Sequence, residues 1–191
     1  MKILAIHGSP KREGASSKAA SELIRHFEKQ GNEIKEYHLD RLNIHGCREC
    51  FLCRTNRTDV CAVNDDLSEI LESAKDVDLL IVSSPIFFAD ISAQLKCFID
   101  RTWSYFGKNG TSAGHLPRNR SLVFILSYGY TDGHIYDSIF EKYKRYFNMM
   151  GFDHCHLITA CGAQYHSPEI VNEREVERMI ENIVTQIKSA R

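Results

Sequence analysis

Four cysteines lie within one short stretch of the chain, at Cys47, Cys50, Cys53 and Cys61. Two residues separate each neighbouring pair among the first three, and seven residues separate Cys53 from Cys61. Three thiolates at this spacing can wrap one corner of an iron–sulfur cubane, with a fourth ligand arriving from farther along the chain. Zinc sites more often pair two such knuckles across a longer insert, and the second knuckle is absent here. The spacing favours an iron–sulfur cluster, while zinc and reduced packing thiols stay open as alternatives.

A second candidate site is the glycine- and serine-rich stretch at residues 7–17. It reads His-Gly-Ser-Pro-Lys-Arg-Glu-Gly-Ala-Ser-Ser and combines small residues, three hydroxyls and two cations directly before a predicted helix. Backbone N–H groups and the helix dipole at a helix N-terminus attract phosphate, so this stretch predicts a phosphate site. An ordinary strand-to-helix turn is the alternative.

Counting residues excludes three other phosphate-binding loops. Five residues separate Gly8 from Gly14 and Ala15 follows, so a P-loop does not fit. The glycine fingerprint of dinucleotide-binding folds is also missing from the stretch. No cysteine has an arginine six positions later, which excludes a phosphatase loop of the Cys-x5-Arg type.

Strands and helices alternate around these residues. Short apolar runs predict strands at residues 2–7, 33–39, 77–83, 121–127 and 154–160. Apolar residues at helical spacing predict helices over residues 19–30, from 66 to 74 with Asp66 and Glu69 as a capping box, and over 91–102, 135–150 and 176–187.

This alternation predicts an α/β fold, a parallel sheet with helices on both faces. Five strands in 191 residues suit a flavodoxin-like three-layer sandwich with strand order 2-1-3-4-5. Ligands of such sheets bind at the carboxyl ends of the strands, at the switch between strands 1 and 3, where residues 7–17 lie.

Composition narrows the class of protein. The chain holds 24 Lys and Arg against 25 Asp and Glu, a net charge of −1, which argues against a nucleic-acid partner. No apolar run approaches the roughly 20 residues of a membrane helix, so we expect no membrane partner. Residues 1–6 are too short for a signal-peptide core, and we expect a cytoplasmic protein.

No linker interrupts the chain, so we expect a single domain over 1–191 with a cysteine-rich loop at 43–64. The other cysteines, Cys97, Cys155 and Cys161, are expected to pack as apolar side chains.

Three stretches resemble a known family. Residues 8–17 are similar to the FMN-phosphate loop of the NADPH-dependent FMN reductase-like branch of flavodoxin-fold proteins. Residues 83–88 (Ser-Ser-Pro-Ile-Phe-Phe) resemble its second flavin loop, and residues 91–101 resemble the helix that follows. The resemblance covers essentially residues 2–130. Within this family, the compact cysteine motif resembles that of the iron–sulfur flavoproteins.

The resemblance implies cofactors and the residues that hold them. FMN phosphate would be held by Ser9, Lys11, Ser16 and Ser17. The isoalloxazine ring would be lined by Pro85, Ile86, Phe87 and Phe88, and approached from another side by Ser127, Tyr128, Gly129 and Tyr130. A [4Fe-4S] cluster would be held by Cys47, Cys50, Cys53 and Cys61. Tyr128 and Tyr130 depart from the glycine-rich loop that relatives often carry there.

We therefore expect an FMN-dependent oxidoreductase that transfers electrons through FMN, with a [4Fe-4S] cluster in the cysteine loop. The resemblance also implies a homodimer or homotetramer, with ferredoxin or another redox protein as partner. One alternative is an NAD(P)H-dependent FMN or quinone reductase without a cluster, for which NAD(P)H is a co-substrate. Another is a non-enzymatic protein whose cysteine loop binds zinc or senses redox state.

Overall fold

Six strands form one sheet in the computed structural model, which describes residues 1–55, 60–106, 115–162, 178 and 181–185. The strands are β1 (Lys2–His7), β2 (Glu33–His38), β3 (Leu79–Phe87), β4 (Asp90–Ile91), β5 (Ser121–Ser127) and β6 (His154–Ala160). The sheet has the order β2-β1-β3-β5-β6, all parallel, and β4 pairs antiparallel with β3. Because β4 is only the return arm of a hairpin, the five parallel strands follow the predicted order 2-1-3-4-5. The flavodoxin-like sheet is therefore confirmed.

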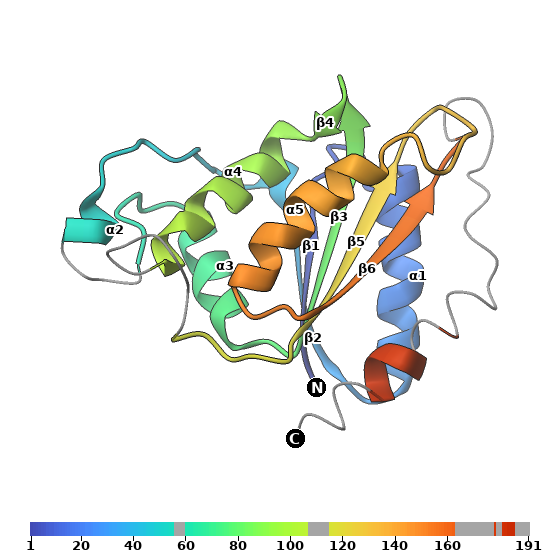
Figure 1. Ribbon diagram of the computed structural model, residues 1–191, viewed down its shortest axis with the longest axis horizontal. Coiled ribbons are helices and arrows are strands. Elements are labelled where there is room, and N and C mark those ends of the chain that lie inside the picture. The colour runs from blue at the N-terminus through green and yellow to red at the C-terminus, as the bar shows by residue number, and fades with distance from the viewer. Residues whose placement is uncertain (56–59, 107–114, 163–177, 179–180, 186–191) are drawn as a thin grey trace.

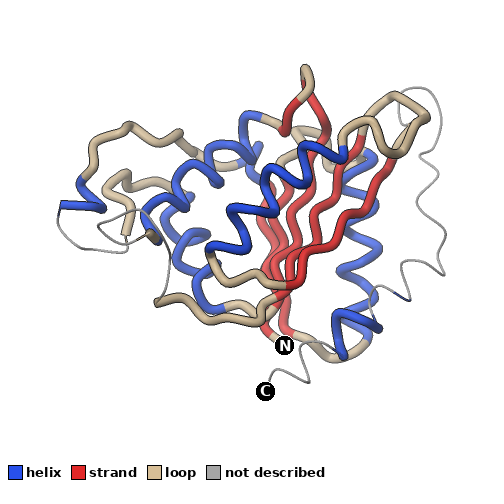
Figure 2. Tube along the Cα trace, in the orientation of Figure 1, coloured by secondary structure: helices blue, strands red, loops and turns tan. Residues whose placement is uncertain are grey.

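Helices cover both faces of this sheet (Figure 1). They are α1 (Ala15–Lys29), α2 (Leu52–Thr55), α3 (Leu67–Ser73), α4 (Ala93–Arg101) and α5 (Asp137–Met149), with 3-10 turns η1 (Leu39–Arg41), η2 (Ala74–Asp76) and η3 (Thr102–Tyr105). Helices α3, α4 and α5 lie on one face and α1 on the other, so the sheet runs between two helical layers (Figure 2). Most of the helix predicted over 176–187 lies outside the described residues. Its described residues, 178 and 181–185, are helical, and Ile183 is buried on the α1 side.

The two helical layers explain why the strands are nearly all apolar. Alternate residues of a strand face opposite sides of a sheet. In β1, Ile3 and Ala5 belong to the core under α1, whereas Leu4 and Ile6 belong to the core under α3, α4 and α5. A central strand of a doubly covered parallel sheet therefore has no polar face, as the runs at 77–83 and 121–127 indicated.

Several elements differ from their predicted bounds by one to four residues; α1, for example, begins at Ala15, four residues before the predicted start. Strand β3 runs on to Phe87, four residues beyond the predicted run, and pairs Pro85 with Ser127 of β5. Helix α3 begins as predicted, but the Asp66–Glu69 capping box is wrong. The Asp66 carboxylate does not cap the helix, because it accepts the backbone N–H of Asn43 at 2.7 Å instead.

Within the described part of the chain, no helix is both long and apolar enough to cross a membrane.

Candidate functional site

The carboxyl ends of β1, β3 and β5 meet at one edge of the sheet, at the top of Figure 1. The strand register pairs His7 with Ser83 and Pro85 with Ser127. Chain direction changes at Gly8, whose N–H donates to the Ser83 carbonyl at 2.8 Å. A Cβ at Gly8 would lie 2.7 Å from Leu95 Cβ, so only glycine fits between β1 and α4. The loop that follows is thus held tightly against the start of α4.

One carbonyl group organises the loop between β1 and α1. The carbonyl of Lys11 accepts hydrogen bonds from the Gly14 N–H at 3.0 Å and from the Ser9 and Ser17 hydroxyls at 3.0 and 3.1 Å. The Lys11 N–H in turn donates to Ser9 Oγ at 3.1 Å. Ser9 and Ser17 are buried and therefore fix the loop's shape, while the Lys11 and Arg12 side chains point into solvent.

The first backbone N–H groups of α1 have no side-chain cap and are available to a ligand. Gly14 occupies the N-cap position and offers no side-chain acceptor to the first amides of the helix. Ser16 is buried, and its hydroxyl has no hydrogen-bond partner among the described residues. Buried polar groups without partners are rare, and uncapped amides plus a free hydroxyl at a helix N-terminus suit an anion. The residues present fit the phosphate of FMN.

The predicted aromatic loop is the hairpin of β3 and β4. Phe87 pairs with Asp90, so Phe88 and Ala89 form a two-residue turn, and both have left-handed backbone angles (φ 48° and 65°). Pro85 and Ile86 are partly buried, Phe87 is 52% exposed and Phe88 is fully exposed. These residues present apolar surface beyond the sheet edge.

The hairpin is tied to the α5 layer through Asp90. Its carboxylate accepts from Lys142 Nζ at 2.7 Å and from the Tyr143 hydroxyl at 2.9 Å. Burial alone would raise the pKa of Asp90, but Lys142, the Ile91 N–H at 2.8 Å and the Tyr143 hydroxyl together hold it below its ordinary value. The exposed phenylalanines are therefore carried on an anchored element.

The segment after β5 contributes backbone rather than aromatic rings. Ser127 is buried at the end of β5, and Gly129 is half-buried. The Tyr128 ring is buried against Tyr136, with centroids 4.9 Å apart, and its hydroxyl donates to the Gly133 carbonyl at 2.7 Å. Burial raises the pKa of Tyr128 to about 12, so the hydroxyl stays a donor at neutral pH. Tyr130 is exposed.

The ends of the cysteine segment are clamped by a buried arginine. Arg101, at the end of α4, pairs with Asp65 at 2.5 Å and donates to the Val63 carbonyl at 2.6 Å. The His45 carbonyl also accepts from Arg101, at 3.3 Å, and the His45 N–H donates to Asp65 at 2.8 Å. Residues just before Cys47 and just after Cys61 are thus joined.

Asp100 and Arg101 are adjacent in the sequence, which predicts an ion pair between them at the end of the helix. In the structure Asp100 pairs with Lys96 instead, and Arg101 pairs with Asp65. Burial alone raises the pKa of Asp65, yet the Arg101 guanidinium and the His45 N–H hold it below its ordinary value. In the sequence, the only sign that Arg101 is buried is its position close to the apolar stripe of its helix.

Between these anchors the cysteines differ in exposure. Cys47 and Cys50 are exposed, whereas Cys53 and Cys61 are partly buried and Cys61 packs against the α3–α5 core. Burial raises the pKa of the Cys53 thiol and the charge of Cys61 raises it further, whereas the adjacent Arg54 guanidinium lowers it.

Helix α2, which carries Cys53, is fixed from outside the segment. Arg54 donates to the Phe106 carbonyl at 2.7 Å, and its guanidinium lies 3.9 Å from the centre of the Trp103 ring. Figure 1 shows α2 and its flanking chain projecting beyond α4, away from the sheet.

The cysteines are not gathered as a zinc site would gather them. A Zn–S bond of about 2.3 Å puts tetrahedral thiolates about 3.8 Å apart. Among the described residues, three potential ligand atoms of His, Cys, Asp or Glu come within 4.8 Å of one another at His7, Glu36 and His38. No cysteine belongs to that group.

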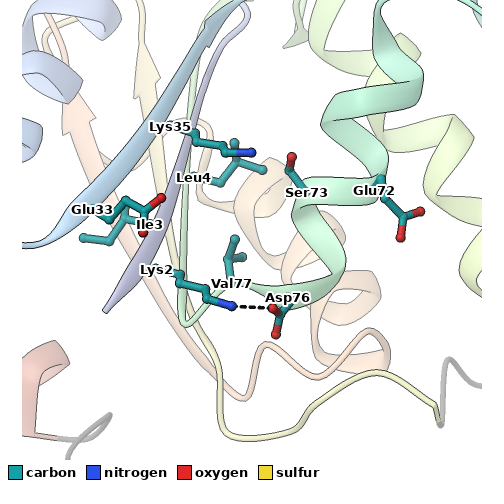
Figure 3. Close-up of a pocket in the computed structure, with 9 residues that line it drawn as sticks. All are labelled: Lys2, Ile3, Leu4, Glu33, Lys35, Glu72, Ser73, Asp76 and Val77. Carbon is teal, nitrogen blue, oxygen red and sulfur yellow. Dashed lines mark hydrogen bonds and ion pairs between the residues drawn. The ribbon is translucent and has the colours of Figure 1, made fainter.

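A pocket of about 270 Å³ opens at the opposite edge, near the amino ends of β1 and β2 (Figure 3). Charged side chains of both signs line it, and Lys2 pairs with Asp76 at 2.6 Å. Parallel sheets bind ligands at their carboxyl ends, so this pocket carries no part of the site.

Comparison with known proteins places the chain in a family. The model of the family described as NADPH-dependent FMN reductase matches residues 1–137. An iron-sulfur flavoprotein of Archaeoglobus fulgidus is 31% identical over 117 residues, covering 61% of this chain and 49% of that protein. An FMN-dependent NADH:quinone oxidoreductase of Pelagibacter ubique is 28% identical over 196 residues, covering 96% of this chain and 100% of that protein.

A solved structure shares the whole fold. The NAD(P)H:quinone oxidoreductase from Methanothermobacter marburgensis superposes with a TM-score of 0.65 at 17% identity, covering 100% of this chain and 94% of that one. The chain aligns with only about half the length of the iron-sulfur flavoproteins it matches. Because the family model covers 137 of 191 residues, the chain belongs to the NADPH-dependent FMN reductase family of FMN-dependent oxidoreductases.

Proposed function

We propose that the chain is a redox flavoprotein that binds FMN at the carboxyl edge of the sheet. The observation that carries this is the buried Ser16 hydroxyl without a partner at the uncapped start of α1. The first amides of α1 and the Ser16 hydroxyl would donate to the phosphate, and Lys11 would add positive charge. Ser9 and Ser17 shape the loop through the Lys11 carbonyl and so hold these donors in place.

The flavin ring would lie against the surface that follows β3 and β5. Pro85 and Ile86 supply apolar contact, and the exposed Phe87 and Phe88 would shield the ring from water. Backbone groups of Ser127, Tyr128 and Gly129 would face the ring's polar edge, since the Tyr128 side chain is engaged with Tyr136 and Gly133. Flat apolar surface plus nearby backbone donors is what a protein uses to bind and tune a flavin.

We further propose that Cys47, Cys50, Cys53 and Cys61 hold a [4Fe-4S] cluster. The Arg101–Asp65 clamp supports this, because it closes the base of a segment that contains four cysteines and no long apolar run. Loaded with both groups, the protein would exchange one or two electrons at FMN and one at the cluster, linking a one-electron donor such as ferredoxin to a two-electron acceptor.

An NAD(P)H-dependent quinone reductase without a cluster is the second candidate. It is favoured by the full-length alignment with the Pelagibacter ubique protein, whose name states that activity. We propose for either function that residues 1–191 form one domain and that copies associate as a homodimer or homotetramer. The exposed phenylalanines of the β3–β4 hairpin support association.

Titration of FMN into flavin-free protein tests the phosphate site. Ser16→Ala removes a hydrogen bond to a charged group, a loss of about 1.5–3 kcal/mol, so the Kd for FMN rises about 10- to 150-fold. Ser21→Ala, farther along α1, is the matched control and leaves the Kd unchanged. Equal Kd values for Ser16→Ala and the unaltered protein would place the phosphate elsewhere.

Anaerobic reconstitution with iron and sulfide separates the two candidates. If the cysteines bind a [4Fe-4S] cluster, the reconstituted protein should contain acid-labile sulfide and show a broad absorbance beneath the flavin bands. Cys50→Ala should lose both iron and sulfide yet keep FMN, whereas Cys155→Ala should keep all three. A pure flavin spectrum without sulfide would exclude the cluster and favour the quinone reductase without one. Protein that takes up no FMN would exclude both proposed functions.

A further inference from the structure

Two histidines and a glutamate meet on the α1 side of the sheet, outside the residues assigned so far. His7 ends β1, and Glu36 and His38 lie two residues apart on β2. The register pairs His7 with His38 and Ala5 with Glu36. Because alternate residues of a strand share a face, all three side chains emerge on the same side as Ala5 and Ile3, which belong to the core under α1.

Their ligand atoms converge. Glu36 Oε1 lies 2.9 Å from His7 Nε2 and 3.1 Å from His38 Nε2, and all three atoms are within 4.8 Å of one another. Ligands that share an ion at about 2.1 Å are about 3.0 Å apart at right angles and about 3.4 Å apart in a tetrahedron. The two oxygen–nitrogen separations match those of ligands around one centre, and the Glu36–His38 contact is also a hydrogen bond.

His7 supplies the second observation. Its side chain is fully buried, and its Nε2 makes no hydrogen bond within the described chain although Glu36 Oε1 is 2.9 Å away. The oxygen is close to this nitrogen but out of line with its N–H direction. Two ligands of a common ion stand in this relation, whereas a hydrogen-bonded pair would be aligned.

The other nitrogen of His7 is held as a metal ligand's would be. Ser83 Oγ lies 3.2 Å from His7 Nδ1. Such a second contact fixes the ring and leaves the remaining nitrogen to bind the ion.

His38 is placed to adjust. Its ring stacks on that of His7, with centroids 4.3 Å apart and planes inclined by 10°, so one ring must tilt for both to point at one ion. The His38 side chain is 19% exposed, and its Nδ1 has no hydrogen-bond partner among the described residues. Tilting the ring therefore gives up the stacking on His7 and the contact with Glu36, and the ion would replace the second of these.

We propose that His7, Glu36 and His38 bind one divalent transition-metal ion, with Zn²⁺ as the probe ion. Imidazole and carboxylate are the ligands that Zn²⁺, Fe²⁺, Co²⁺ and Ni²⁺ share, and three protein ligands leave at least one position for water or an anion. The site is separate from the cysteines and independent of the proposed function. It adjoins Gly8, so the ion adds positive charge next to the loop that starts there.

Zinc stoichiometry of the full chain tests the site. Metal-free protein is equilibrated with ZnCl₂, dialysed and assayed for bound zinc. Glu36→Gln and His38→Ala should each bind one zinc ion fewer than the unaltered protein, whatever number the cysteines take. The matched control is His134→Ala, which breaks an exposed histidine–carboxylate pair with Asp137 at 3.0 Å and should bind the same number as the unaltered protein.

Ring ¹⁵N shifts give a second readout that needs no variant. Adding Zn²⁺ to ¹⁵N-labelled protein should move the Nε2 resonances of His7 and His38 and leave those of His134 in place. Unchanged resonances for His7 and His38, or equal zinc content in Glu36→Gln and the unaltered protein, would overturn the proposal. This readout also decides the matter if His38→Ala fails to fold.

Discussion

At the scale of single residues, the Arg101–Asp65 pair shows what local spacing leaves undetermined. Arg101 and Asp65 are both buried and are separated by 36 residues along the chain. The adjacent Asp100 is the nearest acidic residue along the chain, yet it pairs with Lys96 on the surface. A buried charge needs a partner, but which residue supplies it depends on how a loop folds back, and spacing holds no such information.

Breaking this pair is predicted to be costly. Asp65→Asn leaves the Arg101 guanidinium buried without a counter-charge, and we expect the free energy of unfolding to fall by about 3–5 kcal/mol. Asp100→Asn is the control: its partner Lys96 is exposed, so the loss should stay below about 1 kcal/mol. Urea unfolding of both variants decides this, and similar losses would show that the clamp does not stabilise the fold.

The same pair gives a pH dependence. The folded-state pKa of Asp65 lies below its ordinary value of about 3.9, so ionised Asp65 stabilises the fold above that pH. This stability is lost as the pH falls through the lowered pKa. Comparing urea midpoints at pH 7 and pH 3 should therefore give a larger drop for the unaltered protein than for Asp65→Asn. An equal drop would contradict the assignment.

At the scale of elements, the sheet was predictable and the hairpin was not. The strand at 121–127 matches β5 residue for residue, because burial on both faces leaves an unbroken apolar run with sharp ends. The strand at 154–160 also matches β6, although this edge strand is mostly half-buried and carries two histidines. The hairpin lacks the Asn-Gly or Asp-Gly pair that marks such turns, and Pro85 argued against a continuing strand. The four-residue α2 is too short to show any period.

The turn of this hairpin is predicted to be strained. Ala89 has φ 65°, and a left-handed conformation costs a non-glycine residue roughly 1 kcal/mol or more. Ala89→Gly should therefore raise the free energy of unfolding by up to about 1 kcal/mol. Ala93→Gly, in the exposed first turn of α4, has ordinary helical geometry and should lower it instead. Urea unfolding measures both, and a lower stability for Ala89→Gly would show that the turn is unstrained.

At the scale of the whole molecule, the hairpin is also where the proposed association is open to test. Phe88 is fully exposed and Phe87 half-exposed on an element anchored through Asp90, so their apolar area is held in one place rather than left to fold back. Burying this apolar area against a second copy of the chain stabilises the dimer by roughly 25 cal/mol for each Å² removed from water.

We expect Phe88→Ser to shift the protein toward monomer in sedimentation equilibrium. Tyr146→Ser, which removes another half-exposed aromatic ring on α5, should leave the association constant unchanged. If Phe88→Ser associates as tightly as the unaltered protein, the copies meet through another surface, and the exposed phenylalanines then have only the flavin ring to cover.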